Sequence, residues 1–116
     1  MQTVIETFEF LRRAKECDVT EEEREEIVNF IAANPLAGNE IKGIGGARKV
    51  RFARSRGGKS GGYRVITFYS GVDIPVFLLS MFAKNEKTDL TPKERNALKK
   101  ILPQVVQDYK ARSKKP

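Results

Sequence analysis

The chain has 116 residues with 22 basic and 15 acidic side chains, a net charge of +7, one cysteine and no histidine. This composition excludes a catalytic histidine pair, a histidine-ligated metal site, a multi-cysteine zinc site and an internal disulfide. No segment approaches the ~18 apolar residues of a membrane span, and the first residues show no secretory signal, so we expect a cytoplasmic protein with no membrane contact.

The N-terminal third predicts a short strand and two helices. The β-branched run TVIE at 3–6 suits a strand, and a first helix follows it. Thr20 and Glu23 form a capping box that predicts a second helix from about Glu21, and the Asn-Pro pair at 34–35 ends it. The side chains expected to face the core are Phe8, Leu11 and Ala14 in the first helix and Ile27, Phe30 and Ile31 in the second.

The middle of the chain changes to a period of two, which indicates strands. Strands are predicted at 48–53, 63–70 and 74–82. In the first, Val50 and Phe52 alternate with Lys49 and Arg51, so one face enters the core and the other presents cations. The other two strands are joined by a short turn, which predicts an antiparallel hairpin. Glycines at 38–46 predict an irregular connection before them.

The C-terminal part predicts a last helix. Thr91 supplies its N-cap, Pro92 its first turn and Glu94 the partner of a capping box. Pro103 removes a helical hydrogen bond, so we expect a kink or a split there. The predicted class is α+β, a single domain over 1–116 with a small, mostly antiparallel sheet, two N-terminal helices, a C-terminal helix and a flexible basic tail from about 111.

Charge is distributed unevenly along the chain. Residues 1–47 carry five basic and ten acidic side chains, whereas 48–116 carry seventeen and five, which gives net charges of −5 and +12. Between Arg48 and Arg64 there are seven cations and no acid. Because such cations repel one another, they indicate a polyanionic partner, although a solvated basic loop would carry the same charges. We expect Arg48 to pair with the acidic N-terminal half.

The stretch ARSRGGKSGG at 53–62 satisfies a relaxed form of the nucleotide-binding phosphate loop. Such a loop binds phosphate because its backbone amides lead directly into a helix N-terminus. Here the Gly-Lys-Ser of the motif, at 58–60, is followed by Gly61 and Gly62 and then by a predicted strand in place of a helix. We therefore interpret the stretch as a cationic loop between antiparallel strands that moulds itself to a sugar-phosphate chain.

Two longer stretches carry a resemblance. NPLAGNEIKGIGGARKVRFARSRGGKSGGYRVITFY and SMFAKNEKTDLTPKERNALKKIL resemble the RelE/ParE superfamily of bacterial toxins, specifically its HigB-like branch, with its GGxRKxR strand, glycine-rich basic loop and YAKNE-type turn. The similarity covers about 34–102 and, more loosely, the preceding helices. It implies a RelE-like fold and a ribosome-dependent endoribonuclease that cuts mRNA in the A site and is neutralised by an antitoxin.

A ribonuclease without histidine or metal remains chemically reasonable, because RNA supplies its own nucleophile. The 2'-hydroxyl attacks the adjacent phosphorus when it is held in line, so positioning and charge stabilisation provide much of the catalysis. No cofactor is expected. The resemblance assigns catalytic roles to Lys49, Arg51, Arg64 and Lys84: the first two hold phosphate, Arg64 braces the scissile phosphate, and Lys84 lies in the turn after the third strand. We expect these four cations to converge on one concave face.

Further RNA contacts are expected from Arg48, Arg54, Arg56, Lys59, Tyr63 and Asn85. Other superfamily members offer an additional arginine in the turn and a tyrosine before the last helix, where this chain has Asn85 and Thr91. The general base therefore stays open between Glu86, Tyr63 and Lys49. Asp89 is interpreted as a polar residue preceding the last helix.

The resemblance also implies partners. One partner is mRNA on the ribosome, with contacts to 16S rRNA. The other is a cognate antitoxin with a helix-turn-helix domain, and the toxin is expected to contact operator DNA only through this antitoxin. Two alternatives stay open: a ParE-like toxin that inhibits gyrase without nuclease activity, and a non-catalytic RNA-binding domain, for which exposed aromatic residues on the sheet would be expected.

Overall fold

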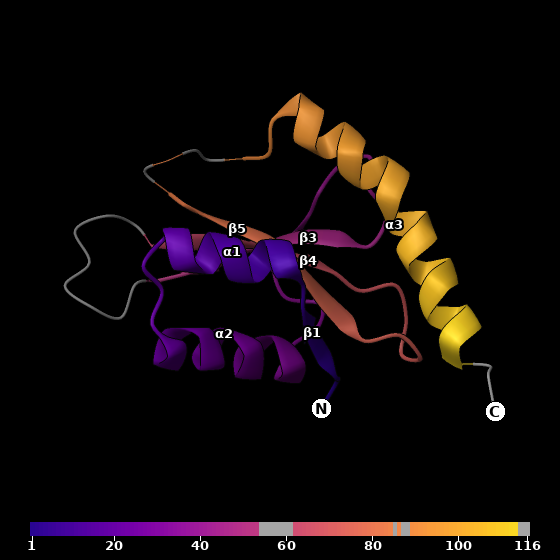
Figure 1. The fold of residues 1–116 in the computed structure, drawn as a ribbon, viewed down its shortest axis with the longest axis horizontal. Coiled ribbons are helices and arrows are strands. Elements are labelled where there is room, and N and C mark those ends of the chain that lie inside the picture. The colour runs from indigo at the N-terminus through magenta and orange to yellow at the C-terminus, as the bar shows by residue number, and fades with distance from the viewer. Residues whose placement is uncertain (54–61, 85, 87–88, 114–116) are drawn as a thin grey trace.

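The computed structural model describes residues 1–53, 62–84, 86 and 89–113. These residues form an α+β fold with one sheet, as predicted (Figure 1). The elements are β1 (Val4–Glu6), α1 (Phe8–Glu16), α2 (Glu21–Ala33), β2 (Asn39–Glu40), β3 (Ala47–Phe52), β4 (Tyr63–Phe68), β5 (Val76–Ala83) and α3 (Pro92–Ser113).

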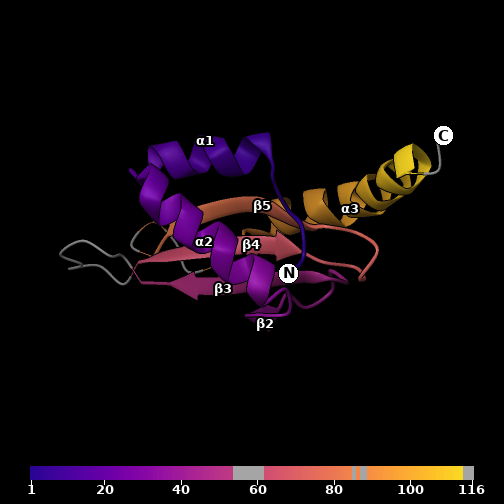
Figure 2. The same cartoon turned by 90° about the horizontal axis from the view of Figure 1, so that it is seen from below.

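The strands are ordered β1-β5-β4-β3-β2, and Figure 2 shows the last four one below the other. Antiparallel pairing joins β2, β3, β4 and β5, whereas β1 pairs with β5 in parallel. The antiparallel hairpin predicted for the strands at 63–70 and 74–82 is confirmed, and these strands are β4 and β5. The parallel edge pair was not predicted, because the sequence gives no signal for which strand an N-terminal run will join.

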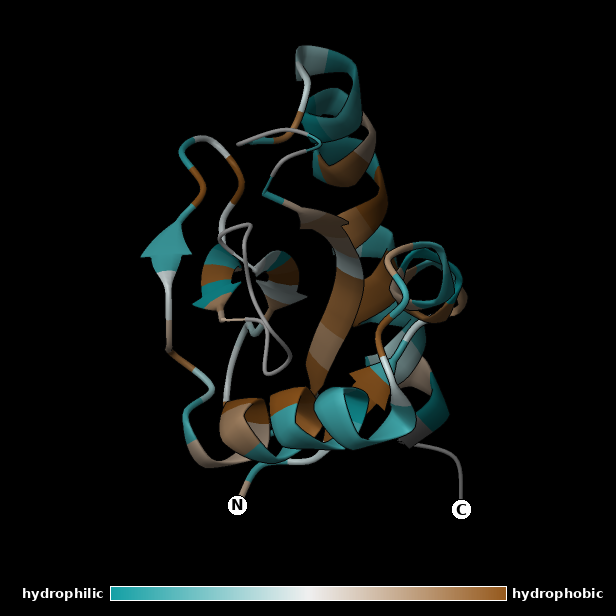
Figure 3. Cartoon of the chain, turned by 90° about the vertical axis from the view of Figure 1, so that its left-hand side faces the viewer, coloured by the Kyte–Doolittle hydropathy of each residue, from teal (hydrophilic) through white to brown (hydrophobic). Residues whose placement is uncertain are grey.

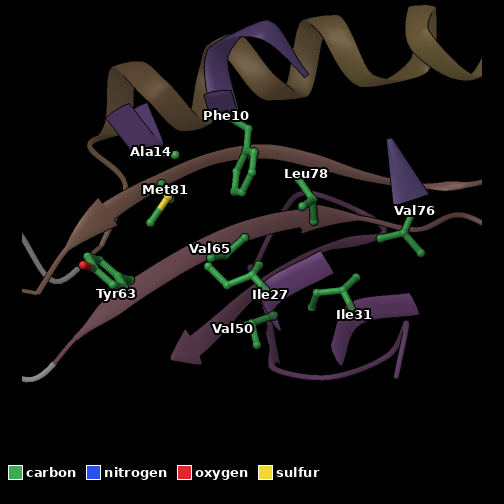
Figure 4. Packing of buried hydrophobic residues seen from close by; sticks show 10 residues of the cluster. All are labelled: Phe10, Ala14, Ile27, Ile31, Val50, Tyr63, Val65, Val76, Leu78 and Met81. Atoms are coloured by element: carbon green, nitrogen blue, oxygen red, sulfur yellow. The ribbon is translucent and has the colours of Figure 1, made fainter. Parts of the chain in front are cut away.

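Helices cover both faces of the sheet. One core cluster joins Phe10 and Ala14 of α1 and Ile27 and Ile31 of α2 to side chains from β3, β4 and β5 (Figure 4). The second cluster places Leu102 of α3 against the opposite face. In Figure 3 the long curved strand near the middle of the view is largely brown, whereas the short strand at the left is teal and the helices carry long teal stretches.

The predicted apolar face of α1 is confirmed for Ala14 but wrong for Phe8 and Leu11. Phe8 is 83% exposed and Leu11 is also exposed, whereas Phe10 and Ala14 are buried. Figure 4 shows the Phe10 ring reaching down toward the strands between Met81 and Leu78. Residues four apart share a helix face, so seating Phe10 and Ala14 on β5 turns Phe8 outward.

In α2 the prediction was correct for the buried Ile27 and Ile31. Phe30 is instead 45% exposed and makes an edge-to-face contact with Phe52, with ring centroids 5.5 Å apart. The predicted capping box is confirmed, because Thr20 Oγ1 accepts from Glu23 N and Glu23 Oε1 accepts from Thr20 N, each at 3.1 Å.

The last helix begins as predicted, with Thr91 and Glu94 in reciprocal hydrogen bonds. The expected split at Pro103 is wrong, because α3 continues through this exposed position to Ser113, whereas the kink expected as its alternative stays a prediction. One missing N–H removes a single hydrogen bond, and the turns on either side keep their own. Residues 111–113, expected in a flexible tail, belong to this helix. Within the described residues, α3 and the other helices are too short or too polar to cross a membrane.

The glycine-rich connection contains β2, which was not predicted. Asn39 and Glu40 pair with Lys49 and Arg48 of β3. Immediately before β2, Gly38 has a φ of +91°, and a Cβ there would lie 2.5 Å from Lys49 O. Glycine is therefore required for β2 to approach β3 this closely.

Candidate nucleic-acid interface

Three of the four predicted catalytic cations share one face of the sheet. Arg51 of β3 lies directly opposite Arg64 of β4, and Lys49 lies two residues from Arg51 along the same strand. Directly opposite residues of an antiparallel pair project to the same face, and so do residues two apart on one strand. This is the face covered further along by α3, because Ile66, opposite Lys49, packs in the cluster of Leu102.

These cations line a depression of about 490 Å³ along the edge of β3, which we call the β3-edge depression. It forms there because β2 pairs only with Arg48 and Lys49, and among the described residues no strand continues beyond them. Its full lining is Phe30, Ala37, Gly38, Asn39, Lys49, Val50, Arg51 and Arg64. Cationic and apolar surface therefore meet in one place, which suits a ligand with phosphates and flat rings.

Arg64 is the most buried cation of the group, at 8% exposure. Its Nη1 donates to Tyr63 O at 3.4 Å, and Arg51 stands opposite it. Within the part of the chain that the structure describes, no carboxylate forms an ion pair with either arginine. Like charges directly opposite one another in a sheet are destabilising, so this pair favours the binding of an anion between the two side chains.

Lys49 is held differently. Its Nζ lies 3.4 Å from Asp89 Oδ2, and the same oxygen accepts from Arg95 Nη2 at 3.1 Å. Partial burial raises the pKa of Asp89, but the Leu90 N–H and the charges of Lys49 and Arg95 outweigh it, so the pKa lies below its ordinary value of 3.8. Asp89 thus joins the start of α3 to the cationic face. Sequence reasoning missed this link, because no local pattern relates Lys49 to residues forty positions away.

Lys84 follows β5 in the turn where it was predicted, and its N–H donates to Gly62 O at 3.0 Å. It is exposed, and it is not one of the residues that line the β3-edge depression. Arg48 pairs with Glu40 at 3.2 Å and also donates to Gly38 O. The expected pairing of Arg48 with the acidic N-terminal half is therefore confirmed.

The expected role of Tyr63 in stacking on RNA is wrong. Its side chain is 2% exposed and lies at one end of the core cluster formed with α1 and α2 (Figure 4). A ring buried on that side of the sheet offers no face to a base and is removed from the depression, so Tyr63 is also dropped as general base. Alternation explains this, because its neighbour Arg64 projects to the opposite face.

Glu86 is also directed away from the depression. Its carboxylate accepts a hydrogen bond from Arg13 Nη2 of α1, the helix on the opposite face of the sheet from α3. Of the three candidate bases, Lys49 alone therefore lines the depression. Its ammonium group is engaged by Asp89, which suits charge stabilisation better than proton abstraction.

A comparison with protein families decides the class. The family model described as RelE toxin of RelE / RelB toxin-antitoxin system matches residues 2–114. The chain belongs to the RelE toxin family. It is therefore the toxin component of a toxin-antitoxin system, a class whose members pair with antitoxins. The predicted superfamily is confirmed, while the HigB-like branch stays a prediction.

Several predicted residues of this RelE family toxin remain to be placed. Arg54, Arg56, Lys59 and Asn85 lie outside the described residues. Residues 54–61 of the predicted cationic loop lie outside the described residues, and β4 begins at Tyr63 directly after Gly62, which agrees with the rejection of a nucleotide-binding loop. Cys17 is partly buried against the core cluster of α1 and α2, and burial raises the pKa of its thiol, so this side chain acts as a small packing residue. Among the residues described, no group of three or more histidine, cysteine or acidic side chains could hold a metal ion.

Proposed function

We propose that this RelE family toxin is a metal-independent endoribonuclease that cuts mRNA in the ribosomal A site and acts in the cytoplasm. The observation that carries the proposal is the directly opposed pair Arg51 and Arg64, with Lys49 beside it, along an open depression. A scissile phosphate placed between the two arginines would relieve their repulsion and receive charge-assisted hydrogen bonds from both.

The reaction needs only the RNA, water and these side chains. The ribose 2'-hydroxyl gives its proton to water and attacks the adjacent phosphorus, the P–O5' bond breaks, and water protonates the departing 5'-oxygen. The products are a 2',3'-cyclic phosphate and a 5'-hydroxyl. Arg64, fixed by burial, stabilises the charge that develops on the phosphorane, and Arg51 holds the phosphate from the opposite strand. Lys49 adds positive charge, oriented by Asp89. Phe30, which lines the depression and is 45% exposed, supplies an apolar surface for a base.

The proposal includes partners. The cations of β3 and β4, which belong to the basic half of the chain, would contact 16S rRNA and mRNA, since cations gathered on one part of a surface attract polyanions. The antitoxin that pairs with this family member would carry a helix-turn-helix domain and would bind operator DNA for the pair. Lys84, in the turn after β5, is proposed to contact the RNA chain next to the scissile phosphate.

The test is a purified translation system in which the 5' ends of the mRNA are mapped. Arg64→Ala removes the buried donor, and this substitution could also disturb folding. Arg51→Ala removes the exposed arginine opposite it, so the second variant tests the same site without that risk. Arg112→Ala, in the last turn of α3, removes the same charge away from the depression and serves as control. Removing one transition-state donor costs about 10²–10³ in rate, so both site variants should lose cleavage to this extent.

Ribosome-dependent cuts phased with codons, present for wild type and the Arg112 control and lost in both site variants, would support the proposal. Intact mRNA from folded wild type would refute it. If that protein also inhibited gyrase supercoiling, the ParE-like alternative would take its place. Cleavage that persists in both site variants would remove the arginine pair from the mechanism.

A further inference from the structure

Arg13 of α1 connects a helix on one face of the sheet to the turn after β5. Its Nε donates to Met81 O at 3.0 Å, and its Nη2 donates to the Glu86 carboxylate. Its Nη1 is bound by Glu16 of its own helix. All three nitrogens of this guanidinium group are therefore used, and two of them bind residues that lie 68 and 73 positions further along the chain.

The turn after β5 is fixed at both sides by described residues. Lys84 N–H donates to Gly62 O, and Glu86 N–H donates to Ala83 O, each at 3.0 Å. Gly62 lies two residues before Arg64, so the first bond ties Lys84 to the strand that carries the buried arginine. The Glu86 side chain ties the other side of the turn to α1.

The neighbouring Arg12 shows what distinguishes Arg13. Arg12 bridges Glu9 and Glu16 within α1, and its side chain is 46% exposed, whereas that of Arg13 is 15% exposed. Exposed pairs within one helix contribute little, and the Glu86 carboxylate is itself 43% exposed. The Arg13 guanidinium is nevertheless mostly buried and also bonds a backbone carbonyl, so its charge-assisted hydrogen bond to Glu86 is more directional than those of Arg12. Burial lowers the pKa of Arg13, but the hydrogen bonds that it donates to Glu16 and Glu86 outweigh this effect and raise the pKa above its ordinary value.

Arginine suits this position for a geometric reason. Its planar fork reaches the Met81 carbonyl, the Glu16 carboxylate and the Glu86 carboxylate simultaneously, from nitrogens that point in different directions. A lysine ammonium is a point charge on a flexible stem, so it could keep one carboxylate but would lose the three-way connection.

We propose that Arg13 is a positioning residue which, through Glu86, holds the turn carrying Lys84 against the strand of Arg64. This inference rests on the proposed function, since it assigns the turn a part in RNA cleavage. It makes α1 a structural support of the catalytic face, although that helix covers the opposite side of the sheet. Lys84 contacts the RNA, and Arg13 acts only through the turn.

The test uses Arg13→Gln, Glu86→Gln and the conservative Arg13→Lys, with Arg12→Gln as matched control. Backbone hydrogen exchange at Lys84 and Glu86 reports on the turn and needs no RNA. We expect faster exchange at both amides in Arg13→Gln and Glu86→Gln, an intermediate effect in Arg13→Lys, and wild-type exchange in the control.

Cleavage kinetics supply the second readout. Because a displacement of about 1 Å can cost roughly 10²-fold in rate, we expect Arg13→Gln and Glu86→Gln to lower kcat about ten- to a hundredfold with little change in KM. Arg13→Lys should recover part of the loss, and Arg12→Gln should cleave like wild type. A merely structural role would lower thermal stability without this selective loss of kcat.

The outcomes separate the two proposals. If wild type cleaves no RNA, the proposed function fails, while the exchange data still decide whether Arg13 holds the turn. If wild type cleaves and Arg13→Gln keeps the wild-type kcat, the positioning role is overturned. Unchanged exchange at Lys84 and Glu86 in that variant would overturn it equally.

Discussion

Replacing Gly38 by alanine tests whether the close approach of β2 to β3 shapes the site. Gly38 has a φ of +91°, and its missing side chain leaves room for backbone atoms of β3. An added Cβ would lie 2.5 Å from Lys49 O and 2.9 Å from Val50 Cγ2. The carbonyl oxygen belongs to a strand paired on both sides, so it cannot rotate away as a flexible side chain would.

Two terms set the size of the effect. A non-glycine residue held at such a dihedral costs about 1–3 kcal/mol, and forcing an extra carbon into a packed contact costs about 1–3 kcal/mol more. We therefore expect Gly38→Ala to lower the free energy of unfolding by at least ~2 kcal/mol, a large share of the roughly 5–15 kcal/mol that stabilises a typical domain. At about 4 °C per kcal/mol, Tm should fall by about 8 °C or more.

Urea denaturation followed by far-ultraviolet circular dichroism measures this difference. The matched control is Gly45→Ala in the same connection, where a Cβ would meet no atom within 4 Å and φ is not positive. At such a position alanine restricts the unfolded chain, so the control should be neutral or stabilised by up to about 1 kcal/mol. A Gly38→Ala protein within about 0.5 kcal/mol of wild type, the usual range of surface substitutions, would refute the reasoning.

Two further predictions concern stability. Phe10→Ala should cost about 3–5 kcal/mol because the ring is fully buried, whereas Phe8→Ala, at a side chain 83% exposed, should stay within about 0.5 kcal/mol; equal losses in chemical denaturation would contradict the assignment of the α1 face. Asp89 has a lowered folded pKa, so its contribution is present above its ordinary pKa of 3.8 and is lost as pH falls through the folded value. Because the side chain is 41% exposed, Asp89→Asn should cost under ~1 kcal/mol at pH 7, with the difference from wild type vanishing in acid; a difference that is constant with pH would count against this.

Local patterns predicted most of the elements because their causes are local. The capping boxes at Thr20 and Thr91 satisfy N–H groups within a few residues, and the alternation around Val50 follows from the geometry of one strand. The placement of Lys49 and Arg51 on one face and of Arg64 opposite Arg51 follows from the same alternation once the two strands pair. The shared cationic face could therefore be predicted from sequence.

Features that depend on distant partners could not be predicted. The apolar residues of α1 fit more than one helix face, and only contact with β5 selects Phe10 over Phe8. The same holds for Tyr63, which was expected to contact RNA although its strand register turns it into the core. The connection of Arg13 to Glu86 spans 73 residues, and no spacing rule relates them.

The parallel edge strand has a consequence for how the protein is made. Val4 of β1 pairs with Val76 of β5, so the first strand cannot join the sheet until more than seventy further residues have been synthesised. At roughly 5–20 residues per second this takes about 4–14 s. Until then the nascent chain lacks the β5 residues against which Phe10 packs and the Glu86 carboxylate to which Arg13 donates. The sheet therefore cannot be completed until the ribosome has synthesised β5.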